Sequence, residues 1–397
     1  MTRPFARDVC IVGAGATRFG ELFDLGYHDL AVDAALAALD DAGIDRGEIE
    51  AGWLGTATPN VSGLDGDAGT DLAEPLGLRN VPVTRVANYC TSGMEAVRAG
   101  ALAVAGGAYD TVLCAGVEKM RDVPARGSLL ARHVVDTHPM LAKGRSAPGQ
   151  FGLLGTRYLE EFGYDREVLA AVALKNHDNG ALNPRAHFRN RITEEQWARA
   201  QMVASPLGLF DCCPTTDGGA AVVLTTRERA ESLGRPYTLL RGAGLATWGG
   251  YFTMQFENDF DFLGFPATRA AAADAYAMAG VDDPARQIDV AEVHDCFTIT
   301  ELINYEDLGF CGRGQGGRMA AEGRTRIGGD LPVNTSGGLK ACGHPIGATG
   351  VRMVVDVVDQ LLGRAGERQV ESARRGLCHT LGGPGIVSCV MVVEAAA

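Results

Sequence analysis

Strand-like and helix-like segments alternate along this chain, and the alternation occurs twice. In the first half, "VCIVGAG" (9–15) precedes the helical pattern "YHDLAVDAALAALDDAGI" (27–44), and the apolar run "YDTVLCAGVEKM" (109–120) predicts a buried strand. In the second half, "TRAAAADAYAMAGV" (268–281) predicts a helix and "IDVAEVHDCF" (288–297) predicts another strand. Such alternation predicts an α/β fold with a largely parallel sheet. The repetition predicts two similar halves packed around a shared cleft.

The alternation is interrupted once, between about residues 121 and 205, where an irregular stretch precedes two helical patterns. This stretch predicts a lobe inserted into the first half. We therefore expect an N-terminal half formed by residues 1–122 and 206–234, an inserted loop lobe of residues 123–205, and a C-terminal half of residues 235–397.

Composition excludes several classes of protein. A formal net charge of −13 argues against a general nucleic-acid binder. The chain has no uninterrupted apolar run of about 18 residues, so no membrane span is predicted. Its 10 cysteines, without a secretory signal pattern, indicate reduced thiols and a cytoplasmic protein. No pair of CxxC motifs occurs, so no metal site is predicted.

Cys90 lies in "NYCTSGMEAVRAG" (88–100), between a strand pattern and a helix that is rich in small apolar residues. The first turn of a helix has free N–H groups and a partial positive charge, and both favour a thiolate. Position alone leaves two interpretations about equal, a nucleophile or a small buried core residue.

Two histidine motifs in the second half strengthen the nucleophile interpretation. In "EVHDCFT" (292–298), His294 and Cys296 are two residues apart, so at a strand end their side chains would share one face and Asp295 would face away. In "GGLKACGHPIGATG" (337–350), His344 occupies a glycine-rich loop before a predicted helix, where it could orient or deprotonate a thiol.

These motifs together resemble the thiolase superfamily, in particular the archaeal and bacterial acetyl-CoA acetyltransferases and the sterol carrier protein x thiolases. The resemblance also includes "TRFGEL", "GVEKM", "KNH" and "DGGAAVVL", and it follows nearly the whole chain in order. It implies a thiolase fold, with two similar βαβ-rich halves in a five-layer αβαβα arrangement. It also implies an acyl-CoA acyltransferase that catalyses thiolysis of 3-ketoacyl-CoA, the reverse Claisen condensation, or both.

The resemblance implies a role for each matching residue. Cys90 is the nucleophile that forms the acyl-enzyme, and His344 activates it. His294 and His344 form one oxyanion hole, and the backbone N–H groups of Cys90 and Gly382 form the second. Cys296 is the acid/base that moves the α-proton of the substrate. Substrate-binding positions also follow from the resemblance: Met120, Ser336 and Gly337.

The choice of Cys296 rests on a departure from ordinary thiolases, which place their acid/base cysteine in a C-terminal CxG motif. Aligning the glycines of "CHTLGGPG" (378–385) puts Thr380 at that position, with Cys378 two residues early. Cys378 and His379 are therefore expected as residues of a tight turn, whose N–H groups supply an oxyanion pocket.

Alternatives remain open at this stage. A decarboxylating ketosynthase also uses Cys-His-His, but Cys296 and the GHP spelling argue against it. A thiolase-like aldolase or lyase would act on CoA-thioester side chains with an OB-fold partner, and a third alternative is a non-catalytic acyl-CoA or lipid carrier.

The resemblance implies CoA thioesters as substrates and no cofactor. It also implies a homodimer or homotetramer, and a zinc-ribbon/OB-fold protein as a partner. Acyl chain length and reaction direction are not predicted.

Overall fold

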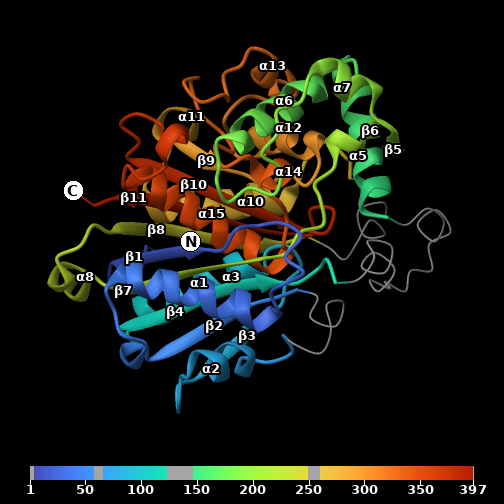
Figure 1. The fold of residues 1–397 in the computed structure, drawn as a ribbon. Helices are drawn as coiled ribbons and strands as arrows, with labels where there is room; N and C mark the ends of the chain where they lie inside the picture. The colour runs from blue at the N-terminus through green and yellow to red at the C-terminus, as the bar shows by residue number, and fades with distance from the viewer. Residues whose placement is uncertain (1–3, 58–65, 123–145, 249–259, 397) are drawn as a thin grey trace.

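Nine strands form one sheet in the order β3-β2-β4-β7-β1-β8-β11-β10-β9 (Figure 1). The computed structural model describes residues 4–57, 66–122, 146–248 and 260–396. The strands of this sheet are β1 (Val9–Ala16), β2 (Ala51–Gly55), β3 (Val83–Val86), β4 (Thr111–Glu118), β7 (Gly218–Thr226), β8 (Thr238–Thr247), β9 (Val290–Glu292), β10 (Arg375–Gly382) and β11 (Val387–Ala395).

The sheet contains two sets of strands that meet where β1 pairs with β8. Counted outward from this pair, the strands of the two sets occupy equivalent places. In the first set, β2 is parallel to β3 and β4, and β4 is antiparallel to β7. In the second set, β9 is parallel to β10, and β10 is antiparallel to β11. Val333 forms a parallel bridge with Ala291 of β9, in the place that β3 has beside β2.

The predicted α/β class is confirmed, but the prediction of a largely parallel sheet is wrong. The sheet is mixed: only β2–β3, β2–β4 and β9–β10 are parallel, and the other pairings among the described strands are antiparallel. Alternation along the sequence does not reveal this, because strands such as β10 and β11 are joined as a hairpin rather than by a helix.

Helices cover both sets of strands and also separate them. Helix α1 (Tyr27–Ala42) packs against β1 and β7, and α10 (Pro266–Ala279) packs against β8 and β11. Between the sets lie α3 (Ser92–Ala105) and α15 (Ile346–Leu361), and α15 contacts strands of both sets. This confirms the five-layer arrangement. The two sets nevertheless form one sheet, because Val9–Ile11 pairs with residues 238–240 of β8.

The sequence explains why these elements are central. Strands β4 and β7 are buried at every position, as expected for apolar strands covered on both faces. Helix α15 is buried along nearly all its length, including Arg352 and Asp356, so it is an internal helix rather than an amphipathic surface helix.

The segment between β4 and β7 packs on the second half of the molecule (Figure 1). It contains three helices and a small hairpin where the sequence predicts two helices: α5 (Ala147–Phe162), α6 (Val168–Ala181), α7 (Glu194–Arg199), β5 (Met202–Ala204) and β6 (Leu207–Gly208). Residues 123–145 of the expected lobe lie outside the described residues. Helix α6 packs against three helices of the second half, α12 (Thr298–Asp307), α13 (Gly316–Ala321) and α14 (Gly338–Ala341).

Short helices complete the described chain: α2 (Thr70–Leu76), α8 (Arg227–Leu233) and α11 (Pro284–Gln287). Among the helices that the structure describes, none is both long and apolar enough to cross a lipid bilayer.

Candidate active site

The thiol of Cys90 lies in a tight turn between β3 and α3, one residue before the N-cap of the helix. Short local bonds build this turn. The Thr91 hydroxyl donates to the Asn88 carbonyl at 2.6 Å, and the Ser92 hydroxyl donates to the Tyr89 carbonyl at 2.5 Å. Tyr89 has a positive φ of 49°. The turn leaves Cys90 only partly buried.

His344 faces this thiol from the start of α15, whose N-cap is Pro345. Its Nε2 atom lies 3.4 Å from Cys90 Sγ, and its Nδ1 atom lies 2.7 Å from Thr349 Oγ1. The Thr349 hydroxyl donates its proton to the Pro345 carbonyl, so it can only accept from Nδ1–H. The hydrogen-bond network therefore places a proton on Nδ1, so Nε2 of the neutral imidazole can accept the thiol proton of Cys90.

His294 completes a three-residue cluster. Its ring centroid lies 5.2 Å from that of His344, with the two rings nearly perpendicular. The side-chain donor atoms of Cys90, His294 and His344 all lie within 4.8 Å of one another. Burial, followed by the effect of His344, holds the pKa of His294 well below its usual value, so its imidazole is neutral. Its Nδ1 atom is buried without a hydrogen-bond partner among the described residues.

The two motifs meet because α3 and α15 pack at unusually close range. A Cβ atom on Gly93 would lie 2.2 Å from the Gly347 carbonyl, and one on Gly350 would lie 2.4 Å from the Met94 nitrogen. Only glycine allows the backbones to approach this closely. A carboxylate from the first set of strands adds a second link, since Glu118 accepts a 2.8 Å bond from the Gly347 N–H.

The HDCF motif differs from its prediction. Strand β9 ends at Glu292, so His294 and Cys296 lie in the turn that precedes α12, and alternation along a strand does not set their directions. Asp295 has a structural task that the sequence does not reveal. It accepts bonds from the backbone N–H groups of Leu339 (2.6 Å) and Lys340 (3.2 Å), and so holds the first turn of α14. Burial raises the pKa of this carboxyl group above the usual aspartate range.

Cys296 is buried close to the cluster. Burial, followed by the neighbouring thiols of Cys213 and Cys90, raises the pKa of Cys296 well above its usual value. The Sγ atom of Cys296 lies 3.8 Å from Oγ1 of Thr300. The sequence did not identify Cys213 as a neighbour of the site. Its backbone N–H donates to the Cys296 carbonyl at 2.9 Å.

The C-terminal motif places Gly382 beside the thiol turn, since a Cβ atom there would lie 3.3 Å from the Cys90 nitrogen. Cys378 and His379 are strand residues rather than turn residues, because β10 continues to Gly382. Cys378 is buried against α15, where its thiol lies 3.5 Å from the Met353 carbonyl. The His379 side chain is bonded instead to Thr268 of α10, on the other face of β10.

The three expected substrate-binding residues occupy different surroundings. The Ser336 hydroxyl is buried, donates to Glu292 at 2.5 Å and accepts from Arg352 at 2.5 Å. Gly337 has a φ of 98° and packs directly against the backbone of α6. Met120 is almost fully buried after β4, and its N–H donates to Asp217 at 2.6 Å.

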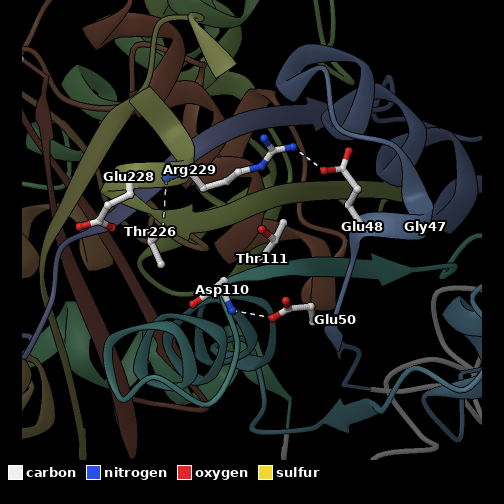
Figure 2. Close-up of a pocket in the computed structure, with 8 residues that line it drawn as sticks. All are labelled: Gly47, Glu48, Glu50, Asp110, Thr111, Thr226, Glu228 and Arg229. Atoms are coloured by element: carbon white, nitrogen blue, oxygen red, sulfur yellow. Dashed lines mark hydrogen bonds and ion pairs between the residues drawn. The ribbon is translucent and has the colours of Figure 1, made fainter. Parts of the chain in front are cut away.

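A separate hollow lies at the opposite end of the central strands (Figure 2). It has a volume of about 600 Å³, and it is lined at the start of β4 by Thr111 and at the end of β7 by Thr226. Two of its acidic side chains are engaged, since Glu48 pairs with Arg229 and Glu50 accepts from the Asp110 N–H at 2.6 Å. This hollow takes no part in the thiol site.

Fold and site together define an α/β protein with a partly buried cysteine, an imidazole base that faces its thiol, and a second, buried imidazole. Two family descriptions match the chain: "Thiolase, N-terminal domain" over residues 9–228, and "Thiolase C-terminal domain-like" over residues 251–395. The chain belongs to the thiolase family, as the motifs predict.

Known relatives extend over nearly the whole chain. An acetyl-CoA acetyltransferase of Methanothermobacter thermautotrophicus is 40% identical over 386 residues, which cover 97% of this chain and 99% of the relative. Sterol carrier protein 2 of Oryctolagus cuniculus is 33% identical over 395 residues, which cover 94% of this chain and 70% of that protein.

Two solved structures share the fold. An Ltp2-ChsH2(DUF35) aldolase matches with a TM-score of 0.84 and 27% identity, covering 100% of this chain and 99% of the matched chain. The Bacillus anthracis acetyl-CoA acetyltransferase matches with a TM-score of 0.75 and 19% identity, covering 98% of this chain and 99% of that chain, and this likeness concerns the fold alone.

Proposed function

We propose that the protein is an acyl-CoA acyltransferase that works through an acyl-enzyme on Cys90. The observation that carries this proposal is the 3.4 Å contact between Cys90 Sγ and the unprotonated Nε2 of His344. A thiol at this distance from a base can lose its proton as it attacks a carbonyl carbon. Membership in the thiolase family, and a 40% identical acetyl-CoA acetyltransferase, support the same activity.

In the thiolytic direction, Cys90 Sγ attacks the keto carbon of a 3-ketoacyl-CoA and His344 takes the thiol proton. The C2–C3 bond of the substrate then breaks, its electron pair leaves as the enolate of acetyl-CoA, and the acyl group stays on Cys90 as a thioester. A CoA thiol attacks that thioester and releases a shortened acyl-CoA. Condensation follows the same steps in reverse.

Negative charge develops on oxygen twice in this sequence, and two sets of donors suit it. We assign His294 and His344 to the thioester oxygen of the enolate, and the N–H groups of Cys90 and Gly382 to the oxygen of the tetrahedral intermediate. The burial of His294 supports this assignment, because a neutral imidazole can donate without carrying a charge into an apolar site. Losing one such donor costs about 10²–10³ in turnover.

Cys296 is the proposed acid/base for the α-carbon. Its raised pKa suits this role, because a protonated thiol can donate to the departing enolate. In the condensation direction, the resulting thiolate removes the α-proton of acetyl-CoA.

Radiolabelled acetyl-CoA tests the proposal directly. The wild-type chain should acquire one acetyl group on Cys90, and Cys90→Ala should acquire none. Cys296→Ala should still become acetylated but lose condensation, whereas Cys378→Ala should retain both steps. Acetylation of Cys90→Ala would contradict the nucleophile assignment, and loss of condensation only in Cys378→Ala would contradict the acid/base assignment.

The aldolase match supports a second candidate, a lyase that acts on CoA-thioester side chains with an OB-fold partner. A matched structure with a TM-score of 0.84 over the full chain is a thiolase-like aldolase named together with a DUF35 protein. Cleavage of a β-hydroxyacyl-CoA by Cys90→Ala would favour this candidate, because a retro-aldol step needs no thiol nucleophile.

The proposal extends to the cellular setting. The substrates are CoA thioesters, and no resident cofactor is required by the steps above. None of the ten cysteines, all of which the structure describes, forms a disulfide bond, which suits a reducing cytoplasm. Strand β3 pairs only with β2 within the described residues, so its other edge suits pairing with a second copy in a homodimer or homotetramer.

A further inference from the structure

We infer that the Cys90–His294–His344 cluster binds a divalent zinc ion, which competes with acylation of Cys90. The cluster supplies one thiol and two imidazoles, which is a donor set that zinc prefers. The lack of paired CxxC motifs argues only against a closed structural site. Three protein ligands with one open position are typical of catalytic rather than structural zinc sites.

The distances fit this ion closely. Zinc bonds of about 2.3 Å to sulfur and about 2.0 Å to nitrogen, arranged as a tetrahedron, separate the two donor atoms by about 3.5 Å. Cys90 Sγ and His344 Nε2 are 3.4 Å apart. The widest donor separation in the cluster is within 4.8 Å, so side-chain shifts on the order of 1 Å bring all three donors into contact with the ion.

The surroundings support ligation by both imidazoles. Metal-bound histidines usually donate their second ring N–H to a fixed oxygen, and His344 does this through Thr349 at 2.7 Å. The His294 ring is buried, and its Nδ1 atom has no hydrogen-bond partner among the described residues. No hydrogen bond at Nδ1 therefore has to break when the ring turns toward an ion.

Binding involves no electron transfer. Zinc takes Cys90 Sγ as the thiolate, the thiol proton leaves to solvent, and the fourth position is filled by water. A Cys90 that carries an acyl or alkyl group has no thiolate to offer, so acylation and zinc binding exclude each other.

Metal binding is tested on the full chain without any substrate. Zn²⁺ is titrated against a chromophoric chelator, and Co²⁺ serves as a second probe because thiolate ligation produces a charge-transfer band. Wild type should bind one Zn²⁺ per chain. Cys90→Ala and His294→Gln should weaken binding at least about 100-fold, and Cys90→Ala should lose the cobalt band. Zn²⁺ should also protect Cys90 of the wild type from alkylation.

Two controls match these variants. Cys311→Ala removes another partly buried free thiol, and His28→Gln removes a histidine that lies outside the cluster. Both should bind zinc as the wild type does. Wild type that binds no Zn²⁺, or Cys90→Ala that keeps the cobalt band, would overturn the inference. Neither result concerns acyl transfer, so the proposed function stands or fails separately on acetyl labelling.

Discussion

The two halves of the molecule use equivalent positions, the start of a central helix, for two different tasks. The start of α3 carries the thiol of Cys90, and the start of α15 carries the imidazole of His344. The thiol turn is held mainly by bonds among residues 88–92. The histidine loop is held by distant carboxylates, Asp295 on the adjacent turn and Glu118 from the other half.

This difference teaches which part of the site is encoded locally. The thiol turn is held by hydrogen bonds among its own residues, so we expect it to keep its shape when neighbouring elements change. A loop held by tertiary contacts needs the whole fold to place its base. Mutations should therefore separate loss of chemistry from loss of position.

Cys90→Ala should lower turnover by a factor on the order of 10⁴ or more, since it removes the nucleophile. The melting temperature should stay near that of the wild type, because the hydroxyl groups of Thr91 and Ser92 supply the bonds that close the turn. Steady-state kinetics and calorimetry measure both effects. A large drop in melting temperature would mean that the thiol turn is not locally held.

Thr349→Val should lower turnover about 10–100-fold, because it removes the acceptor that keeps the proton on Nδ1 of His344. With the other tautomer populated, Nε2 cannot accept the thiol proton. Iodoacetamide should alkylate Cys90 more slowly in this variant at neutral pH. Unchanged alkylation and turnover would show that the tautomer is set by another contact.

Asp295→Asn should cost about 1–3 kcal/mol of folding stability and reduce turnover, since it weakens the bonds that hold the first turn of α14. Asp289→Asn is a matched control. Asp289 also accepts two backbone N–H bonds, from Arg374 and Arg375, but it lies at the opposite end of β9. The control should lose stability without loss of turnover; equal losses of turnover in both variants would contradict the positioning role of Asp295.

Ser92→Ala should have the smallest effect, about 0.5–1.5 kcal/mol of stability, because it removes one local side-chain hydroxyl from the thiol turn. Urea denaturation measures this cost, and acetyl labelling checks that Cys90 still reacts. A larger loss of turnover than in Asp295→Asn would reverse the comparison between the two halves.

The sequence predicted what depends on local pattern. Alternating segments predicted the α/β fold and its internal repeat, and both helix starts were predicted with Cys90 and His344 at them. The roles of these residues followed from family resemblance and stay proposals. Neither motif alone predicts that Cys90 and His344 lie close together, because their approach depends on the contact of Gly93 with α15.

Three details were missed for physical reasons. An apolar run gives no sign of where a short strand ends, so β9 was predicted to reach His294 although it stops at Glu292. Glycines suggested a turn from Cys378, but pairing with β11 extends β10 to Gly382. Asp295 was given no task, since its partners lie more than forty residues away in the chain.

The pairing of β1 with β8 has a consequence for any attempt to divide this protein. Residues Val9–Ile11 of β1 pair with β8 across the boundary between the two strand sets, so neither set ends in an edge strand there. A fragment that ended at this boundary would expose unpaired backbone N–H and C=O groups of β1 or β8. Such strand edges pair with other chains and promote aggregation. The two sets of strands are therefore expected to fold and unfold as one cooperative unit.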